Sequence, residues 1–490
     1  MAAPHQSPVR PSKDLSGTTR RDVIRFAALG LAGLGTGCAR ALPATSSTPA
    51  DRSLVDDLEH RTFRWFWDTG DPATGLVPDR WPSKSFCSIA AVGFALNAYA
   101  VGAERGWISR AQARERTLNT LRFFATAPQG EAAAGMTGHR GFFYHFIDMQ
   151  RGHRFETVEL SSIDTVLLLA GMSFAGSYYS SDDPAEAEIR RLAKEINDRV
   201  DWPWMLGKGP LVSMGWTPEE GFIESQWDRF NESTILYLLA IGSPTHPIDP
   251  AIWHRWTENF AYSWGDHWGE RHLAFAPLFG HQFSHVWVDF RGIRDPWLRA
   301  HNLDLFENSR RATRAQRNYA IANPEGWATY GPDCWGLTAC DGPGDFKLVI
   351  GGREREFHGY TARGPDRIDD GTLAPTAMAS SIAFEPELVR SGLASMKRRF
   401  GPAIYGQYGF FDSFNPTLTE VPPGVSIGGR LVPGFGWVDT DYLGIDQGPI
   451  VGMIANYRNE LIWRAMRRSP PIVAGLKRAG FTGGWLDRVP

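Results

Sequence analysis

Two kinds of helix-forming segment alternate along most of the chain. Segments of the first kind carry one apolar stripe on a polar surface, which predicts helices on the outside of the molecule. One begins with a capping box made by Ser109 and Gln112, and another begins at Asp183-Pro184 with Glu186 in its first turn. The stripes consist of Leu118, Leu121 and Phe124 in the first segment, and of Ile189, Leu192, Ile196 and Val200 in the second.

Segments of the second kind are apolar on nearly every side. Residues 163–172 and 234–241 have this pattern, which at their length is typical of helices enclosed by other elements. Strand-like stretches are few and short, and loops such as 416–436 are long enough to have functions of their own. Because enclosed and outer helices alternate, we expect an all-α, double-layered helical barrel whose loops form a cleft at one end.

Composition narrows the classes of function. The chain has 490 residues, 42% of them hydrophobic, and no linker divides the part after residue 50. We therefore expect one large domain over residues 51–490. The 51 Lys and Arg nearly balance the 54 Asp and Glu, so no broad basic surface is available for nucleic acid. The 19 Trp residues fit a large core, and indole faces are also surfaces on which sugar rings stack.

Residues 1–50 have the pattern of an export signal followed by a linker. Arg20 and Arg21 precede an apolar run, 26–34, that is too short to span a membrane, which predicts twin-arginine export to the periplasm or the medium. A chance Arg-Arg pair is the alternative. Cys38 is a candidate for lipidation, although Gly35 stands where a larger aliphatic residue is usual. Whether a lipid anchors the protein therefore stays open.

The sequence contains no convincing metal-binding pattern. Cys87, Cys334 and Cys340 form no CxxC spacing, and no disulfide framework is expected, although Cys334 and Cys340 remain candidates for a pair. His281 and His285 have the i, i+4 spacing of a zinc helix but lack the accompanying glutamate of HExxH. We expect neither metal nor cofactor, and expect His281 to bind sugar hydroxyls.

Three carboxylates stand at the starts of predicted enclosed helices. Asp164 lies in Glu159–Thr165, where N-capping by Ser161, Ser162 or Asp164 is the structural alternative. Asn231-Glu232 comes directly before residues 234–241, where a low dielectric favours the protonated form of the Glu232 carboxyl. The structural alternative is that Glu232 is a first-turn residue that interacts favourably with the helix dipole. Asp446-Gln447 precedes a third such segment, 450–457. Carboxyl groups in this arrangement are suited to acid and base catalysis on a glycosidic bond.

Other polar segments supply candidates for substrate binding. Arg291 ends the segment that contains His281, and Asp341 stands in an Asp-Gly turn, a motif that is also common without function. Trp335 is predicted to offer a stacking face. Together with Glu159, Asn231 and Gln447, these residues complete the set of candidate glucan-binding side chains.

From about Leu54 to Trp485 the chain resembles the bacterial glycoamylase domain and glycoside hydrolase family 144, whose members act on β-1,2-glucans. The matching segments include TFRWFW, ERGWISR, GFFYHF, ELSSIDT, FNESTILYLLAIGSPTHP, FGHQFSHVWVDFRG, WGLTACDGP, LAPTAMASSIAFEPE, YGQYGFFDSFN and GIDQGPIVGMIANYR. The resemblance implies an (α/α)6 barrel of six helical hairpins, no cofactor, and inverting endo- or exo-cleavage of a glucan. It also makes Glu232 the acid, with Phe230 replacing the family's tyrosine. No obligate protein partner is evident from the sequence.

The resemblance leaves two points open. Either Asp446 or Asp164 activates the water, directly or through a relay. Inversion requires roughly 6.5–9.5 Å between the two carboxyl groups. Because related barrels act on other linkages, a different glycosidase is the first alternative, and a non-catalytic exported glucan-binding protein is the second.

Overall fold

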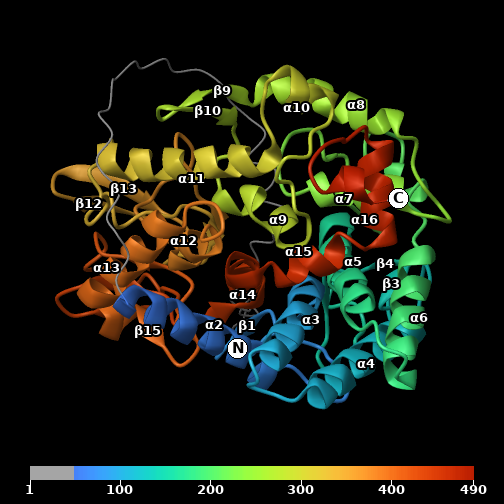
Figure 1. The fold of residues 1–490 in the computed structure, drawn as a ribbon. Coiled ribbons are helices and arrows are strands. Elements are labelled where there is room, and N and C mark those ends of the chain that lie inside the picture. The colour runs from blue at the N-terminus through green and yellow to red at the C-terminus, as the bar shows by residue number, and fades with distance from the viewer. Residues whose placement is uncertain (1–48, 490) are drawn as a thin grey trace, which may run out of the picture.

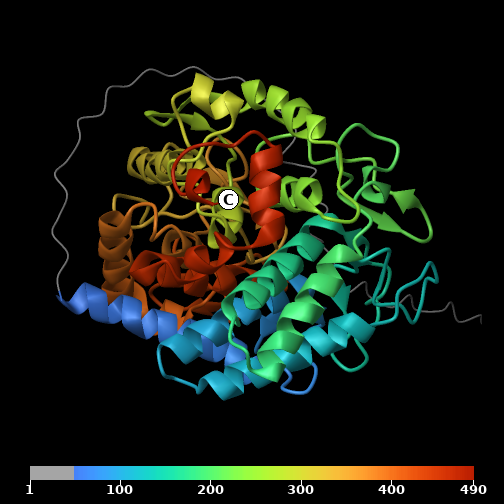
Figure 2. The same ribbon diagram turned by 45° about the vertical axis from the view of Figure 1, so that its right-hand side comes forward.

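The computed structural model describes residues 49–489, in which the main element is the α-helix (Figures 1 and 2). One group of helices is buried along nearly its whole length, as the sequence predicts for 163–172 and 234–241. These enclosed helices are α3 (Ile89–Glu104), α5 (Ser162–Tyr178), α7 (Thr234–Gly242), α9 (Phe283–Trp287), α12 (Pro375–Ser380) and α14 (Gly444–Asn459).

A second group of helices lies against the first with one face buried. The stripes predicted for α4 and α6 are confirmed: Leu118, Leu121 and Phe124 are buried, as are Ile189, Leu192 and Ile196, and the Ser109–Gln112 capping box is present. The long helices of this group are α2 (Pro49–Thr69), α4 (Arg110–Thr126), α6 (Pro184–Asp198), α8 (Ala251–Glu258), α11 (Leu305–Ala322) and α13 (Pro386–Ile404). Shorter helices are α10 (Pro296–Ala300), α15 (Leu461–Met466), α16 (Pro470–Arg478), η1 (Trp204–Leu206), η2 (Asn259–Tyr262), η3 (Leu278–His281) and η4 (Leu486–Arg488).

Neighbouring helices bring distant parts of the chain together. α3 packs between α5 and α14, and α2, at the start of the described chain, packs on α13 and α14 near its end (Figure 1). α3 and α5 approach so closely that a Cβ on Gly93 would lie 2.2 Å from the carbonyl oxygen of Leu167. Gly444 and Gly448 likewise leave room for Ala91 and Phe94, which places the first turns of α14 directly against α3.

Short antiparallel strands are more numerous than the sequence suggests. They are two to five residues long and form sheets of two or three strands, so most are too short to show an alternating pattern. They are β1 (Arg80–Trp81), β2 (Cys87–Ser88), β3 (Gly138–His139), β4 (Phe142–Phe143), β5 (Phe146–Ile147), β6 (Leu160–Ser161), β7 (Gly215–Thr217), β8 (Gly221–Phe222), β9 (Trp264–His267), β10 (Glu270–Leu273), β11 (Ala339–Cys340), β12 (Phe346–Ile350), β13 (Arg353–Phe357), β14 (Thr361–Ala362), β15 (Tyr405–Gly406), β16 (Gly409–Phe410), β17 (Phe414–Asn415), β18 (Arg430–Val432), β19 (Gly436–Val438) and β20 (Tyr442–Leu443).

Several of these strands directly precede an enclosed helix. β2 leads into α3 and pairs with β5, β6 leads into α5 and pairs with β7, and β20 leads into α14 and pairs with β1. The strand pairs therefore tie the N-terminal ends of α3, α5 and α14 to their surroundings. Helix α14 begins at Gly444, six residues before the expected residue 450. Pro449 has no backbone N–H, so one helical hydrogen bond is missing, and the burial of Ile445 and the close packing of Gly448 against Phe94 compensate for this loss.

The predictions for the N-terminal region remain predictions. The Arg20-Arg21 pair, the apolar run and the lipidation candidate Cys38 all lie outside the described residues. Among the described helices, none is both long enough and apolar enough to span a membrane. The three cysteines of residues 49–489 are buried free thiols, so the candidate pair Cys334–Cys340 is not formed.

Candidate active site

The three predicted catalytic carboxylates all lie at N-terminal ends of enclosed helices. Asp164 and Asp446 are each the third residue of their helices, α5 and α14, and Glu232 lies two residues before α7. Their exposed fractions are 1%, 6% and 2%, respectively. For Asp164 and Asp446, which lie in the first turns of their helices, the partial positive charge of the helix N-terminus stabilises an anionic side chain where burial alone would be costly.

Hydrogen bonds join the helix ends that carry these groups. The Gly444 N–H of α14 donates to the Asp79 carbonyl, and two residues earlier Val77 accepts from the N–H of Ser88, the N-cap of α3. The next N–H, of Ile89, lies 3.5 Å from the His145 carbonyl, and the His145 N–H donates to the Glu159 carbonyl ahead of α5. These bonds bring the N-terminal ends of α14, α3 and α5 to one side of the molecule.

At the start of α5, a buried histidine lies between two carboxyl groups. His145 Nδ1 is 3.2 Å from Glu159 Oε1, and its Nε2 is 3.5 Å from Asp164 Oδ2. Ser161 is the N-cap: its hydroxyl accepts from the Asp164 N–H and donates to Asp164 Oδ2 at 2.5 Å. The imidazole of His145 therefore links the carboxyl groups of Glu159 and Asp164, and an imidazole can both accept and donate a proton.

The Glu232 segment is fixed through its backbone. Asn231 Oδ1 accepts from the Ser233 N–H at 2.9 Å, and the Ser284 hydroxyl at the second residue of α9 donates to the Glu232 carbonyl at 2.8 Å. Glu232 lies outside the first turn of α7, whose N-cap is Ser233, so the predicted alternative of a first-turn glutamate does not describe it. Asn231 and Ser284 thus orient the backbone on which the Glu232 carboxyl depends.

His281 is part of the packing beside this segment. Its ring lies 5.2 Å from the Phe230 ring, and its Nε2 contacts the backbone of Phe275 at 3.2 Å. Burial lowers its pKa well below the ordinary value, so the ring is neutral. His285 instead contacts the Ser309 hydroxyl at 3.0 Å, and neither histidine belongs to the potential metal-binding group among the described residues.

At the start of α14, Asp446 and Gln447 lie beside a group of buried aspartates. Gln447 donates to the Phe410 carbonyl at 3.3 Å, and the negative charge of Asp446 contributes to raising the pKa of Asp412. Asp341, Asp412 and Asp439 each have a carboxylate oxygen within 4.8 Å of the other two. Burial raises the pKa of all three carboxyl groups.

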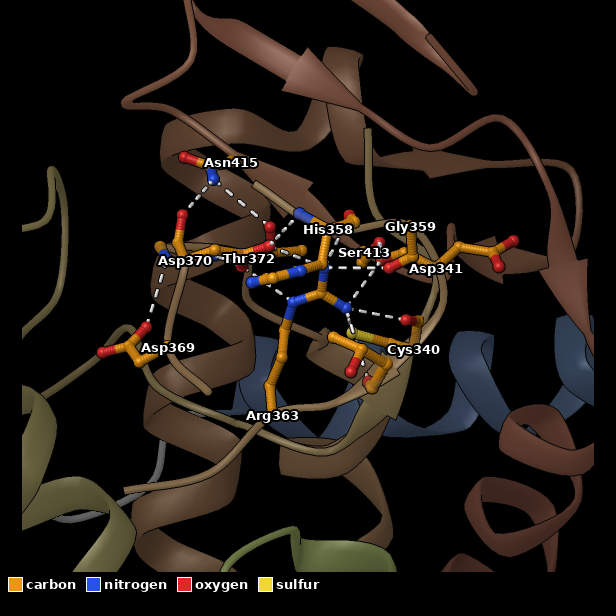
Figure 3. A network of polar contacts seen from close by, with 12 residues as sticks. Cys340, Asp341, His358, Gly359, Arg363, Asp369, Asp370, Thr372, Ser413 and Asn415 are labelled. Carbon is orange, nitrogen blue, oxygen red and sulfur yellow. Dashed lines mark hydrogen bonds and ion pairs between the residues drawn. The ribbon is translucent and has the colours of Figure 1, made fainter. Parts of the chain in front are cut away.

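Arg80 and Arg363 hold the Asp341 segment in different ways. Arg80 donates to Asp341 Oδ2 at 2.6 Å, which is a direct ion pair with the side chain. Arg363 is fully buried, forms a two-bond ion pair with Asp370 at 2.8 Å, and donates to the Cys340 carbonyl at 2.8 Å (Figure 3). It therefore fixes the backbone that precedes Asp341 rather than the carboxylate itself.

Two predicted binding residues lie elsewhere. Trp335 is 0% exposed and belongs to the hydrophobic core, so the predicted stacking face is wrong: its ring is covered by protein. Arg291 pairs with Asp289 at 2.7 Å and with Glu460 at 2.9 Å, beyond the C-terminal end of α14. Asp446 is at the opposite end of that helix, about 20 Å away at 1.5 Å per residue, so Arg291 is not brought to the candidate site.

Reasoning from the residues missed His145, Arg80, Asp412 and Asp439. Arg80 lies in the two-residue strand β1, and the other three lie close to strands of two or three residues; the partners that make each of them notable lie far away in sequence. Asp439 gave one local signal, because it stands seven residues before Asp446 in a run that also contains Asp441. His145 gave none beyond its place in an aromatic segment.

Comparison with known proteins identifies relatives over most of the chain. An exo-β-1,2-glucooligosaccharide sophorohydrolase (non-reducing end) of Parabacteroides distasonis is 26% identical over an alignment of 471 residues. That alignment covers 89% of this chain and 59% of the relative, so the chain spans less than two thirds of the relative's length.

Solved structures with the same fold include two enzymes. A β-1,2-glucanase from Parabacteroides distasonis is 26% identical with a TM-score of 0.74, over 89% of this chain and 61% of that one. An endo-β-1,2-glucanase from Chitinophaga pinensis, in complex with sophorotriose and glucose, is 25% identical with a TM-score of 0.71, over 89% and 99% of the two chains.

The Glycoamylase family model, described as a glucoamylase family, matches residues 224–470, which make up half of the chain. The matched region contains Glu232, Asp446 and the aspartate group, whereas Asp164 precedes it. The chain belongs to the Glycoamylase family.

Proposed function

We propose that this protein is a glycoside hydrolase that cleaves β-1,2-glucan with carboxyl groups as acid and base. The observation that carries the proposal is a buried glutamate, Glu232, at the start of an enclosed helix inside the region that the family model matches. The named activities of the relatives, an exo-acting sophorohydrolase and an endo-β-1,2-glucanase, supply the linkage.

In the proposed mechanism, Glu232 donates a proton to the glycosidic oxygen as the bond breaks. Its surroundings support this role, because burial disfavours the charged form of a carboxyl group and so keeps a proton available. A carboxylate on the other side of the sugar then removes a proton from the attacking water, which inverts the configuration at the anomeric carbon.

Two carboxylates are candidates for the base. Asp446 is our first choice, since it lies in the matched region and at a helix N-terminus that favours its ionised form. Asp164 is the alternative, and its contact with His145, whose other ring nitrogen contacts Glu159, offers a route by which the proton could leave. An Asp446→Asn variant with wild-type turnover, combined with an inactive Asp164→Asn variant, would transfer the role to Asp164.

We infer that the helices form an (α/α)6 barrel within residues 51–490, with the substrate cleft at the N-terminal ends of the enclosed helices. Support comes from the alternation of enclosed and outer helices along the chain and from the packing of α2 on α13 and α14. Glu159, Asn231 and Gln447 have polar atoms at that end and are the proposed partners of sugar hydroxyls.

We also propose that the protein acts outside the cytoplasm after twin-arginine export. The support is the Arg20-Arg21 pair followed by a short apolar run, and Cys38 is the proposed site of any lipid anchor. Replacement of both arginines by lysine should leave the protein in the cytoplasm of the producing cell. Export of that variant at the wild-type level would contradict the proposal.

The substrate is tested by incubating the purified protein with linear β-1,2-, β-1,3-, β-1,4- and α-1,4-glucans and analysing the products by chromatography. We expect sophorose or short β-1,2-linked oligosaccharides from the first polymer alone. Cleavage of another polymer would keep a glycosidase but reject the linkage. No cleavage of any polymer, together with binding to β-1,2-glucan, would indicate a glucan-binding protein.

The stereochemical course is tested separately by proton NMR of the newly released reducing end during the first minutes of reaction. An inverting enzyme releases the α-anomer from a β-linked glucan, and mutarotation then produces the β-anomer. Initial release of the β-anomer would show retention and would remove the single-displacement mechanism proposed for Glu232 and Asp446.

A further inference from the structure

Three buried aspartates meet close to α14 and have no role in the proposed reaction. Asp341 follows β11, Asp412 follows β16, and Asp439 lies between β19 and β20. One carboxylate oxygen from each lies within 4.8 Å of the others. Segments that are distant in sequence therefore place three negatively charged groups around one point.

Two of these carboxylates have an oxygen that the protein leaves unsatisfied. Asp412 Oδ2 accepts from the Asp341 N–H at 2.8 Å, and Asp439 Oδ1 accepts from the N–H groups of Thr440 and Asp441 at 2.7 and 3.3 Å. Asp412 Oδ1 and Asp439 Oδ2 are fully buried, and no hydrogen-bond donor within residues 49–489 reaches either atom. Since a buried carboxylate oxygen without a partner is costly, these atoms indicate a ligand that brings positive charge.

The charge around the three aspartates is also unbalanced. In the part of the chain that the structure describes, Arg80 is the cation placed against the group: it lies 2.6 Å from Asp341, 3.3 Å from Asp79 and 3.9 Å from Asp441. Arg363, the other buried arginine nearby, is neutralised by Asp370. The carboxylates of Asp341, Asp412 and Asp439, together with those of Asp79 and Asp441, outnumber the single charge of Arg80, and a divalent cation would reduce this excess of negative charge.

We propose that Asp341, Asp412 and Asp439 bind one divalent cation, Ca²⁺ in preference to Mg²⁺. Oxygens within 4.8 Å of one another fit around an ion at Ca–O distances of about 2.4 Å. Ca²⁺ accepts several protein carboxylates in irregular geometry, whereas Mg²⁺ usually keeps most of its waters and takes one or two carboxylates. Asp341, which the sequence suggested as a sugar ligand, is thereby assigned to the cation.

The cation would connect the turns after β11 and β16 to the turn before β20 and α14. Because β20 leads directly into the helix that carries Asp446, binding would stabilise the N-terminal end of α14. The competing state is a group of protonated carboxyls, which the raised pKa values of Asp412 and Asp439 would allow. The ionised carboxylates would bind a divalent cation and the protonated carboxyls would not, so a cation titration distinguishes the two states without a substrate.

The test uses the full chain, freed of metal with EGTA and returned to metal-free buffer at pH 7. CaCl₂ and MgCl₂ are titrated by calorimetry, and Tm is measured with and without 5 mM of each salt. We expect about one Ca²⁺ per chain, at least tenfold weaker binding of Mg²⁺, and a rise in Tm of about 2 °C or more with Ca²⁺.

Two variants and a matched control make the test specific. Asp412→Asn and Asp439→Asn keep the side-chain shape and remove one charge each, so they should fold and should bind Ca²⁺ at least tenfold more weakly. Asp182→Asn, at an exposed position, should bind like the wild type. Absence of both a binding heat and a Tm shift in the wild type would overturn the proposal in favour of protonated carboxyls, and undiminished binding by both variants would also overturn it. Neither result depends on hydrolysis of a glucan.

Discussion

The carboxylates of the candidate site are stabilised by their immediate neighbours. Asp164 receives a hydrogen bond from Ser161 and contacts His145, and the Glu232 backbone is held by Ser284. Asp164 and Asp446 also lie in the first turns of α5 and α14, where the backbone dipole favours negative charge. Burying a carboxylate costs free energy, and these local contacts offset that cost. Buried ionisable groups supported in this way are typical of functional sites.

Trp335 is expected to act on stability and not on substrate affinity, because its side chain is fully buried. Trp335→Phe should lower the free energy of unfolding by about 1–3 kcal/mol through loss of packing. KM for the glucan should stay within about twofold of the wild-type value. A stacking role would give the opposite result, a clear increase in KM with unchanged Tm.

The same residue shows what a sequence can and cannot indicate at this scale. The positions of Asp164 and Glu232 at helix starts could be predicted, because capping residues and apolar runs are local signals, whereas Asp446, expected before a helix, lies in the first turn of α14. The burial of Trp335 in the hydrophobic core and the pairing of Arg291 with Glu460 depend on tertiary contacts, so residue type and neighbours in sequence did not reveal them.

At the scale of elements, close helix packing sets the geometry of the candidate site. The enclosed helices α3 and α5 approach through glycines: a Cβ on Gly93 would lie 2.2 Å from the Leu167 carbonyl, and one on Gly171 would lie 2.1 Å from the Gly93 carbonyl. Both obstacles are backbone atoms, which cannot move aside as a side-chain end can. The position of Asp164 relative to α3 thus depends on positions without side chains.

Gly93→Ala is therefore expected to destabilise the protein by about 3 kcal/mol, at the upper end of overpacking effects. Gly331→Ala is the matched control, since the nearest atom to its Cβ would be 4.0 Å away and its φ is not left-handed. The control should be neutral or slightly stabilising. Equal Tm values for the two variants, measured by thermal unfolding, would contradict the close packing of α3 and α5.

The helices could be predicted from periodicity, and the strands could not. The stripes of α4 and α6 repeat often enough to identify a buried face, whereas two-residue strands such as β6 and β20 contain too few residues for any pattern. These strands precede α5 and α14, and two of the missed residues lie near them: the His145 N–H donates to the Glu159 carbonyl just before β6, and Asp439 lies three residues before β20. The sequence consequently located the helix ends but not the aspartates assembled around one of them.

At the scale of the whole molecule, buried neutral histidines couple folding to pH. Burial lowers the pKa of His272 to about 4 and that of His285 to about 3. An unfolded chain takes up protons at these residues below about pH 6.5, and the folded protein does so only at the lower values. Their contribution to stability is therefore present above pH 6.5 and is lost as the pH falls towards 4.

This coupling predicts a decrease of about 1.4 kcal/mol in unfolding free energy per pH unit for each such histidine below pH 6.5. In His272→Gln, the loss of stability between pH 6.5 and pH 5 should be smaller than in the wild type by one proton's contribution. His254→Gln, at an exposed position, is the control and should follow the wild type. Identical pH dependence of Tm for wild type and His272→Gln would show that His272 is not held neutral.

In the proposed mechanism the Glu232 carboxyl is the acid that protonates the glycosidic oxygen, so replacing Glu232 tests the proposed activity most directly. Reducing ends released from linear β-1,2-glucan are measured for the wild type, Glu232→Gln and the exposed control Glu224→Gln. We expect activity in the wild type, a loss of about 10²- to 10⁴-fold in Glu232→Gln at unchanged Tm, and a rate within twofold of wild type for Glu224→Gln. Wild-type turnover by Glu232→Gln, or no release by the wild type itself, would contradict the proposed glucan hydrolysis.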